Sequence, residues 1–326
     1  AQNYCKMITN RFDLSSNSFV IEVASNDGYL LKNFVSKKIP CLGIEPTKST
    51  ADYSTKFGVR VIQEFFGSKV GSRMAENNEK ADLVIGNNVY AHVPDINDFT
   101  DGIAALLKES GVVTLEFPHL LQLIQHNQFD TVYHEHFSYL SLNTVISIFK
   151  KSNLKVFDVE KLSTHGGSLR VYGCKHTAEH EVRKTVKDIL DLENSSGLKD
   201  NSTYSAFQKL ADDVKDNLIR FLLDAKSNGK SVAGYGAAAK GNTLLNYAGV
   251  RKDLIPFICD AAKSKIGKYM PGSHIPILHP SALEKNRPDY LIILPWNIAD
   301  EVISQNEHLA KLGTKFVIAV PKLKII

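Results

Sequence analysis

Short apolar runs rich in β-branched residues alternate with helix-length amphipathic segments through the first part of the chain. Runs of this length, bounded by turn formers, predict β-strands, and the segments between them predict helices. Strands that alternate with helices form a parallel sheet covered on both faces, in which ligands bind at the carboxyl ends of the strands. The five predicted strands are Phe19–Ala24, Cys41–Glu45, Val59–Gln63, Asp82–Gly86 and Val112–Glu116.

The same alternation returns near the end of the chain, after a different pattern in the middle. Leu154–Glu160 and Thr164–Gly173 predict a strand pair joined by a glycine turn. Segment Glu179–Asn228 is charged and poor in Gly and Pro, so it predicts long amphipathic helices with a solvated face. The predicted strands of the second α/β unit are Ser231–Gly236, Phe257–Asp260, Tyr290–Leu294 and Lys315–Val320.

The length of 326 residues exceeds one ordinary domain of about 150 residues. We therefore expect an α/β protein of three parts. Residues 1–150 form a Rossmann-like domain, residues 151–228 a strand pair with a helical connecting region, and residues 229–326 a smaller Rossmann-like domain.

The composition is that of an ordinary globular protein, with 43% hydrophobic and 23% charged residues. The net charge of +4 includes no long block of like charges, so neither nucleic acid nor a membrane surface is expected as a partner. The chain has no apolar run long enough to span a bilayer and no signal-peptide pattern, so a cytoplasmic location is expected. The four cysteines form no CxxC pair, which predicts free thiols and no metal site in this chain.

Polar residues follow several of the predicted strands of the first unit. A turn after the first strand exposes backbone N–H groups at a helix N-terminus. Glu45 ends the second strand, 17 positions after Gly28, where doubly wound folds place a carboxylate that accepts hydrogen bonds from ribose hydroxyls. Each residue alone is also a common turn former, but such residues after four of the five predicted strands together indicate a ligand site. The residues are Asn26, Asp27, Glu45, Asn87, Asn88, His92 and Pro118–His119.

The turn after the first strand favours one of two ligands that both present a ribose. The sequence ASNDG lacks the early glycines that let a backbone approach a pyrophosphate. A turn carrying Asn26 and Asp27 suits a cationic ligand such as the sulfonium of S-adenosylmethionine better than a nicotinamide dinucleotide. Methyl transfer is therefore favoured over hydride transfer.

The stretch Val132–Leu142 (VYHEHFSYLSL) holds several proton-transfer groups close together. Tyr133, Glu135 and His136 are residue types that perform general acid–base chemistry near neutral pH. The alternative is a polar loop whose histidines are solvated.

Several motifs follow one another from about Tyr4 to the C-terminus: EVASNDGYLLKNF, GIEP, NNVYAHVPD, YHEHFSYLSL, GGSLR, GYGAAAKGNT and FICD. Together they resemble the S-adenosylmethionine-dependent sugar C-methyltransferases of deoxysugar biosynthesis. The resemblance implies a class I methyltransferase-like Rossmann sheet and a smaller C-terminal Rossmann-like domain that helps to hold a nucleotide-linked sugar. It also implies a zinc-binding domain upstream, whose cysteines this chain lacks, so the sequence is expected to begin just after it.

The resemblance implies C-methylation of a nucleotide-linked 4-keto-6-deoxy sugar, whose carbonyl acidifies an adjacent C–H bond. His136 is the expected base, because imidazole titrates in the physiological range, with Tyr133 as the open alternative. Tyr133 and His92 would hydrogen-bond the developing oxyanion, and Glu135 would position a sugar hydroxyl or an imidazole. His134 is left out of the set. The residues expected to bind S-adenosylmethionine are Glu22, Ser25, Asn26, Asp27, Gly28, Glu45, Pro46, Asn87 and Asn88.

Two glycine-containing loops are candidates for binding the phosphates of the substrate. Arg170 would be a bidentate phosphate partner, although a hairpin turn with a surface arginine explains this loop almost as well. In the second unit, Gly234, Gly236 and Gly241 do not fit GxGxxG, and Tyr235 either stacks on a base or packs in the core. The predicted substrate-binding residues are Gly167, Ser168, Arg170, Tyr235, Lys240 and Asn242.

Two other functions stay open at this point. One is a nicotinamide-dependent oxidoreductase with two α/β domains, and the other is a nucleotide-sugar binding protein without catalysis. The sugar, the nucleotide, the methylated carbon and the oligomeric state are not predicted.

Overall fold

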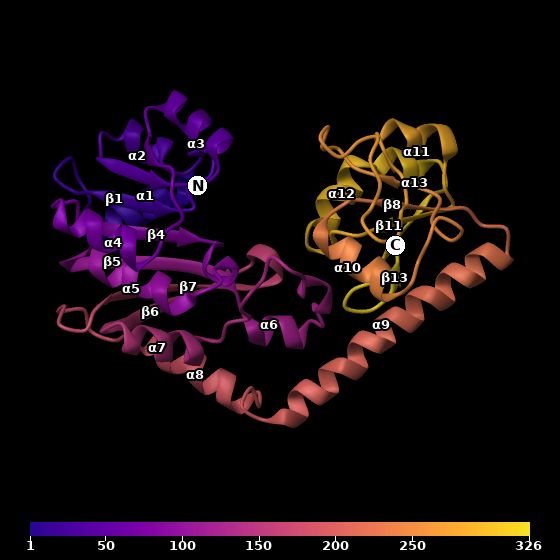
Figure 1. Ribbon diagram of the computed structural model, residues 1–326. Helices are drawn as coiled ribbons and strands as arrows, with labels where there is room; N and C mark the ends of the chain where they lie inside the picture. The colour runs from indigo at the N-terminus through magenta and orange to yellow at the C-terminus, as the bar shows by residue number, and fades with distance from the viewer. The chain divides into compact units, whose positions relative to one another are not determined.

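The computed structural model describes residues 1–326, which divide into two compact units (Figure 1). Unit 1 comprises Ala1–Leu121 and His136–Gly197, and unit 2 comprises Gln122–Glu135 and Leu198–Ile326. These bounds differ from the three expected parts. The strand pair expected in the connecting region joins the sheet of unit 1, and an internal segment of the first domain belongs to unit 2.

Unit 1 contains a seven-stranded sheet in the order β3-β2-β1-β4-β5-β7-β6. The first five strands in this order are parallel, while β7 runs antiparallel to both β5 and β6. Because β1 lies between β2 and β4, the strand order reverses at β1, and open α/β sheets bind ligands at such a point. The strands are β1 (Val20–Val23), β2 (Cys41–Ile44), β3 (Arg60–Ile62), β4 (Ala81–Asn87), β5 (Leu107–Pro118), β6 (Leu154–Leu162) and β7 (Ser168–Lys175).

Helices cover both faces of this sheet, which confirms the predicted architecture. Residues of α4, α5, α7 and α8 share one apolar cluster with the strands, and residues of α1 and α2 share another. In α5, Phe99, Ile103 and Leu106 are buried at helical spacing, and Asp95 caps the first turn by accepting from two backbone amides. The helices are α1 (Gln2–Arg11), α2 (Lys32–Ser36), α3 (Lys48–Ser54), α4 (Ser68–Glu76), α5 (Ile96–Leu106), α7 (Leu142–Lys151) and α8 (Lys184–Ser195), with 3₁₀ turns η1 (Thr55–Phe57), η2 (Tyr90–His92) and η4 (Thr164–Gly166).

Unit 2 contains a six-stranded sheet in the order β10-β9-β8-β11-β12-β13, parallel except for β13. This confirms a second Rossmann-like unit. The short strands β10 and β13 were not predicted. The strands are β8 (Val232–Tyr235), β9 (Ile258–Cys259), β10 (Ile277–Leu278), β11 (Tyr290–Ile293), β12 (Lys315–Ile318) and β13 (Lys324–Ile325).

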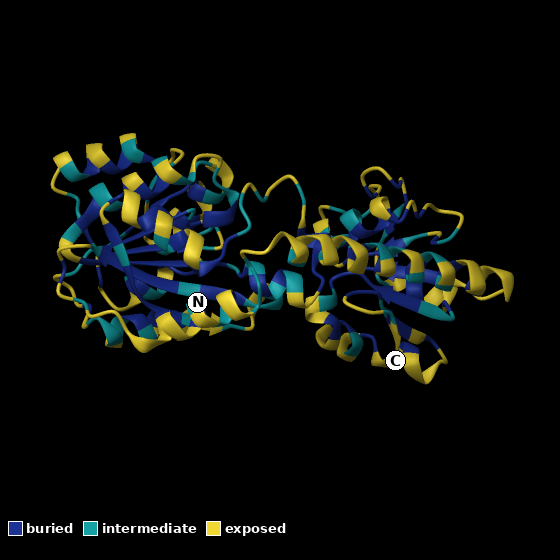
Figure 2. Cartoon of the chain, turned by 90° about the horizontal axis from the view of Figure 1, so that it is seen from below, coloured by how far each residue is buried: buried dark blue, intermediate teal, exposed yellow.

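The helices of unit 2 also form two layers. The predicted long amphipathic helix is α9, which buries Ala211, Val214, Leu218, Leu222 and Ala225 in one cluster with α10, while α11, α12 and α13 contribute to the other. Figure 2 shows the strands of both sheets buried and the outer faces of the helices exposed. The helical elements are α9 (Asn201–Ser227), α10 (Ala239–Tyr247), α11 (Ser281–Asn286), α12 (Ala299–Gln305) and α13 (Glu307–Lys311), with 3₁₀ turns η3 (Phe129–Thr131) and η5 (Trp296–Ile298); α6 (Leu120–Gln125) begins in unit 1 and ends in unit 2.

None of these helices is both long enough and apolar enough to cross a membrane. The four cysteines are free. The side chains form no group of three or more His, Cys, Asp or Glu that is suited to hold a metal ion.

Candidate functional site

The turn after β1 takes a glycine-like shape without the usual glycines. Ala24, Asn26 and Gly28 have φ angles of 57°, 51° and 77°. The left-handed region costs a residue with a Cβ about 1–2 kcal/mol, although Asn visits it more readily than Ala. Strained backbone of this kind is often found at ligand sites. The small number of glycines in the sequence therefore did not predict the left-handed conformation of this turn. The turn lies where the strand order reverses.

Glu45 lies at the end of β2 and ties this end to the β1 turn. The carboxylate is buried, with Oε2 accepting from the Asn26 amide at 3.1 Å and Oε1 from the Thr47 amide at 2.9 Å. A carboxylate has about four acceptor sites, so acceptor capacity remains for ligand hydroxyls. The geometry fits the ribose role expected for Glu45.

Three buried polar atoms near the ends of the adjacent strands β1 and β4 have no hydrogen-bond partner. They are Oε2 of Glu22, Oγ of Ser25 and Oδ1 of Asn87. Burial raises the pKa of Glu22 well above its usual range, and the nearby Asp27 raises it further. Unpaired buried polar groups are costly and call for an explanation. A polar ligand with a positive charge would offer hydrogen-bond donors to these oxygens and stabilise the Glu22 carboxylate, so the residues fit S-adenosylmethionine.

A cavity of about 450 Å³ opens at the same strand ends. Its walls are mainly apolar and aromatic, with a few carboxylates, and a flat heterocycle with an attached sugar suits such walls. Pro46 and His92 lie in the lining as part of the predicted set. Phe65 and Phe66 were not predicted, because only polar residues were considered at the strand ends. The main lining residues are Ala24, Pro46, Phe65, Phe66, His92 and Phe99.

Two of the predicted catalytic side chains, His92 and His136, lie beside each other in unit 1. Their ring centroids are 4.7 Å apart, with the ring planes at 70°. The returning chain docks on η2, because the amides of Phe137 and Ser138 donate to the carbonyl of Ala91 at 2.8 and 3.2 Å. His136 is thereby held next to a residue that lines the cavity.

The histidine-rich stretch is divided between the two units. Tyr133, His134 and Glu135 belong to unit 2, because the division falls between Glu135 and His136. Tyr139, which was not predicted, lies 5.8 Å from His136 between ring centroids. The sequence offered a signal for it, since Tyr139 is the second phenol of the same stretch.

His119, one of the polar residues noted after a strand, has a structural partner. Its Nε2 atom is 2.8 Å from Oε1 of Glu193, and both side chains are buried. Glu193 also accepts from the amides of Leu142 at 2.6 Å and Asn143 at 3.1 Å, so it caps the N-terminus of α7. His119 is therefore part of the packing between α7 and α8.

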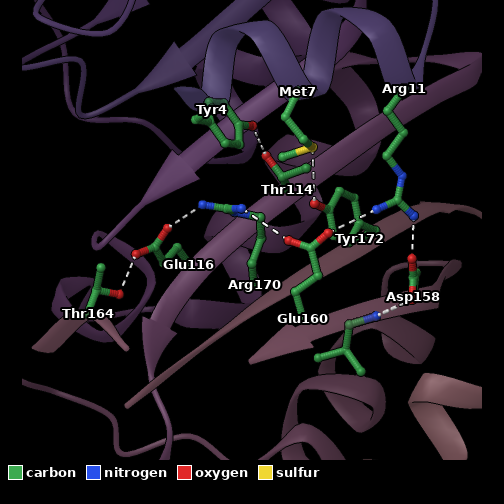
Figure 3. Close-up of polar contacts among 11 residues, drawn as sticks. Tyr4, Met7, Arg11, Thr114, Glu116, Asp158, Glu160, Thr164, Arg170 and Tyr172 are labelled. Carbon is green, nitrogen blue, oxygen red and sulfur yellow. Dashed lines mark hydrogen bonds and ion pairs between the residues drawn. The ribbon is translucent and has the colours of Figure 1, made fainter. Parts of the chain in front are cut away.

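Arg170 lies within strand β7, where the sequence had indicated a phosphate-binding loop. Its guanidinium forms ion pairs at 3.1 Å with Glu116 of β5 and with Glu160 of β6, and it lies 4.7 Å from the ring centroid of Tyr4. Figure 3 shows this network on the sheet beneath α1. Two carboxylates already engage the two terminal nitrogens of the guanidinium, so these ion pairs account for Arg170 within the fold, and its expected phosphate contact stays a prediction.

The neighbouring turn is a closed hairpin. Gly167 N–H and the Ser168 hydroxyl both donate to the carbonyl of Thr164, at 2.9 and 3.0 Å. Ser168 is buried. These contacts match the hairpin alternative. The role of Gly167 and Ser168 in substrate binding stays a prediction.

The turn after β8 in unit 2 uses glycines for conformation and for packing. Gly236 has φ 89°, and a Cβ there would lie 2.5 Å from Cδ of Pro295. A Cβ on Gly241 would lie 2.7 Å from Cβ of Leu294, so this glycine lets α10 pack closely on the sheet. Tyr235 is buried in the apolar cluster beside α11 and α12, so core packing accounts for it better than base stacking.

Lys240 and Asn242 lie in the first turn of α10. The Lys240 ammonium donates to Oδ1 of Asn297 at 2.9 Å and lies 4.4 Å from the ring centroid of Trp296. Partial burial lowers its pKa, while the carboxylate of Asp130 acts in the opposite direction. Oδ1 of Asn242 is buried without a partner. A cation, an unpaired amide oxygen and a helix N-terminus together suit an anionic, hydroxyl-bearing ligand.

Asp260 follows β9 and organises the same turn. It accepts from the amides of Ala237 and Ala262 at 2.7 and 2.8 Å and from the Lys265 ammonium at 3.1 Å. Asp260 was outside the predicted site, although the sequence already showed an acid at the end of this strand.

Comparisons with known proteins agree with this geometry. A methyltransferase domain matches residues 1–159, and a C-methyltransferase C-terminal domain matches residues 163–321. The C-methyltransferase NovU of Streptomyces niveus is 35% identical over 320 residues, which cover 98% of this chain and 76% of that protein. The chain belongs to the sugar C-methyltransferase family. Membership in this family makes the protein an S-adenosylmethionine-dependent C-methyltransferase and decides against the oxidoreductase and the non-catalytic binding protein.

Solved structures resemble the methyltransferase half at low identity. The YcgJ protein from Bacillus subtilis is 12% identical, with a TM-score of 0.42, covering 54% of this chain and 99% of that one. The magnesium protoporphyrin IX methyltransferase from Synechocystis with bound SAM is 11% identical, with a TM-score of 0.40, covering 53% of this chain and 79% of that one. The assignment to the family does not depend on these distant likenesses.

Proposed function

We propose that this C-methyltransferase acts on a nucleotide-linked 4-keto-6-deoxy sugar, at a carbon next to the ketone. The observation that carries the proposal is the pair of His92 and His136, which lies beside the cavity at the ends of the cofactor strands. Carbon is a poor nucleophile unless a proton is removed from it, and an adjacent ketone makes that proton acidic. A site with two imidazoles suits a substrate of this kind.

Bound S-adenosylmethionine supplies a methyl group on a positively charged sulfur. We assign its ribose hydroxyls to Glu45 and its charged amino-acid end to Glu22 and Asp27. The left-handed turn at Ala24 and Asn26 would bring the backbone close to the ligand, and Pro46 with the aromatic lining would cover the base. Asn87 and Asn88 complete the strand ends from which the cofactor is held.

His136 removes the proton in the proposed reaction. The C–H electron pair becomes the enolate double bond, and the carbonyl electrons move to the oxygen. The enolate carbon then forms the new bond to the methyl group, which regenerates the ketone, and the cofactor leaves as S-adenosylhomocysteine. His136 carries the proton away as imidazolium and returns it to solvent.

His92 and Tyr133 donate hydrogen bonds to the enolate oxygen in this account. Preorganised donors at a developing negative charge are typically worth a factor of about 10²–10³ in rate each. Glu135 positions a sugar hydroxyl or orients an imidazole. Tyr133 stays the alternative base, since the choice of His136 rests on the lower ordinary pKa of imidazole.

Unit 2 is proposed to hold the nucleotide of the substrate. Lys240 has a neutral amide as its direct partner and lies in the first turn of α10, so it can meet a phosphate without breaking an ion pair. The unpaired oxygen of Asn242 is an acceptor for a hydroxyl. The cytoplasmic location of the enzyme stays a prediction.

The test is methyl transfer from labelled S-adenosylmethionine to nucleotide-linked 4-keto-6-deoxy sugars, compared with the same sugars reduced to 4-hydroxy compounds. We expect label only in the keto sugars, on carbon. His136→Asn should lower the rate about 10²–10⁴-fold. His134→Asn is the matched control, because this exposed imidazole lies two positions away and should leave the rate unchanged. Label on the oxygen of a 4-hydroxy sugar, or equal losses in the two variants, would contradict the proposal.

A further inference from the structure

An internal segment of the first domain, Gln122–Glu135, belongs to unit 2. Two contacts just before Asp130 in the chain hold it there. Nδ2 of Asn127 donates to the carbonyl of Leu210 in α9 at 2.8 Å. Phe129 is part of the apolar cluster of α9 and α10, with its ring centroid 5.4 Å from that of Tyr247. The turn η3 is therefore seated on unit 2, directly before the histidine-rich stretch.

Asp130 is the centre of this turn and has an unusual environment. Its side chain is 0% exposed, Oδ2 accepts from Nε1 of Trp296 at 2.7 Å, and Oδ1 has no hydrogen-bond partner. Burial raises the pKa of Asp130 to about 6, while the Trp296 hydrogen bond and the Lys240 charge act in the opposite direction. A carboxyl group with one donor in a buried place costs stability compared with an apolar residue of similar size.

Trp296 joins Asp130 to the first turn of α10. Its indole N–H donates to the carboxyl group, and the Lys240 ammonium lies over its ring. Asp130 and Trp296 are 166 positions apart in the sequence, so this hydrogen bond fixes η3 to the part of unit 2 that we assign to the nucleotide. A polar contact of defined direction specifies one arrangement where an apolar contact would allow several.

The hydrogen bond of Asp130 also restricts the residues that follow it in the chain. Tyr133 follows Asp130 by three residues, which can span at most about 10 Å. An anchored Asp130 therefore confines Tyr133, and Glu135 lies only two residues further. Val132, which intervenes, is 48% exposed, so its own side chain does little to hold the chain between η3 and Tyr133.

We propose that Asp130, through its hydrogen bond to Trp296, is a positioning residue that holds the segment carrying Tyr133 and Glu135 in a fixed place on unit 2. The catalytic consequence rests on the function proposed above, whereas the anchoring itself does not. The two are separable, because anchoring is measured by amide exchange and its consequence by turnover.

The first measurement is hydrogen–deuterium exchange of the full chain, followed in peptides that cover residues 122–135. Asp130→Leu removes the acceptor, and Trp296→Phe removes the donor but keeps an aromatic face for Lys240. Both should speed exchange of amides 128–135 at least tenfold without changing the peptides of β1 and β4. Asp130→Asn keeps an acceptor oxygen and should stay within about twofold of the wild type, as should Asp213→Leu on the exposed surface of α9.

The second measurement is the kcat and KM of the same variants in the methyl-transfer assay. Asp130→Leu and Trp296→Phe should lower kcat about 10–100-fold with unchanged affinity for S-adenosylhomocysteine, and Asp130→Asn should restore most of kcat. If Asp130→Leu does not fold, Trp296→Phe decides, since it leaves residue 130 intact. Unchanged exchange in Trp296→Phe overturns the anchor, and faster exchange with normal kcat overturns its catalytic consequence. A wild-type enzyme that methylates none of the keto sugars contradicts the proposed function, while the exchange data still decide on the anchor.

Discussion

The turns after β1 and after β8 occupy equivalent places in their two sheets and differ in charge. Around the first turn, Asp27 and Glu45 accept hydrogen bonds from backbone amides, and Glu22 is buried with an unpaired oxygen. Around the second, Asp260 is paired with the Lys265 ammonium, and Lys240 stands in the first turn of the following helix. The first turn suits a cation and the second suits an anion. The charge of the residues at the strand ends therefore indicates which turn binds a cation and which binds an anion, and the number of glycines does not.

The largest expected effect comes from the glycine of the second turn. Gly236→Ala adds a Cβ at φ 89° and 2.5 Å from Cδ of Pro295. Left-handed strain of about 1–2 kcal/mol and overpacking of about 1–3 kcal/mol should lower the free energy of unfolding by about 2–5 kcal/mol. Denaturant unfolding of the variant measures this. A loss below about 1 kcal/mol would mean that the turn after β8 is not held in its glycine conformation.

A pH-dependent effect is expected at Asp130. Its folded pKa of about 6 lies above the ordinary value of 3.8, so the folded state keeps a proton that the unfolded state loses between these values. The contribution of Asp130 to stability is thus complete below pH 3.8 and falls by roughly 3 kcal/mol as pH rises through 6. Asp130→Asn should raise the free energy of unfolding by roughly 2–3 kcal/mol at pH 8 and change it little at pH 4. An equal change at both pH values would remove the buried-carboxylate explanation.

The acids after the second strand of each sheet should behave differently towards the cofactor. Glu45→Gln removes a charged acceptor from the first turn and should weaken binding of S-adenosylhomocysteine about 10–100-fold, because hydrogen bonds to charged groups contribute roughly 1.5–3 kcal/mol. Asp260→Asn makes the same change in unit 2 and should leave this affinity unaltered. Isothermal titration calorimetry on both variants tests the difference. Similar losses in both would contradict the assignment of the cofactor to the first turn.

The smallest expected effect is at Ala24. Ala24→Gly relieves the left-handed strain at φ 57° but increases the freedom of the unfolded chain, so the net change in stability should lie within about 1 kcal/mol. The contrast with Gly236→Ala is the informative result. A loss of more than 2 kcal/mol would show that the Ala24 methyl group packs in a way that outweighs the strain.

The pattern of hydrophobic and polar residues predicted the two sheets, because each strand and each helix can be recognised from its own residues. Leu154–Glu160 and Thr164–Gly173 were correctly predicted as a strand pair, but their membership in the first sheet was not. That membership depends on the pairing of β7 with β5, which are separated by residues 119–167, and no local pattern encodes such a pairing. The transfer of Gln122–Glu135 to unit 2 was missed for the same reason.

The candidate site was predictable where it follows strand ends and less so where it depends on partners. Glu45 and His92 lie at strand ends, as the pattern of polar residues predicted, and Pro46, which the resemblance implied, lines the cavity beside them. The ion pairs of Arg170 were not predicted, because its two carboxylate partners lie on other strands and are not neighbours in the sequence. Asp130 was missed since a single Asp before an aromatic stretch carries no signal without the distant Trp296.

In the proposed reaction, His136 removes a proton from the carbon beside a ketone. The most direct measurement of this step is deuterium incorporation at that carbon in D₂O, followed by NMR on a nucleotide-linked 4-keto-6-deoxy sugar with S-adenosylhomocysteine in place of the donor. The account predicts exchange at one carbon in the wild-type enzyme and in His134→Asn, and exchange slower by about 10²-fold or more in His136→Asn. Equal exchange in all three proteins would contradict the assignment of His136 as the base.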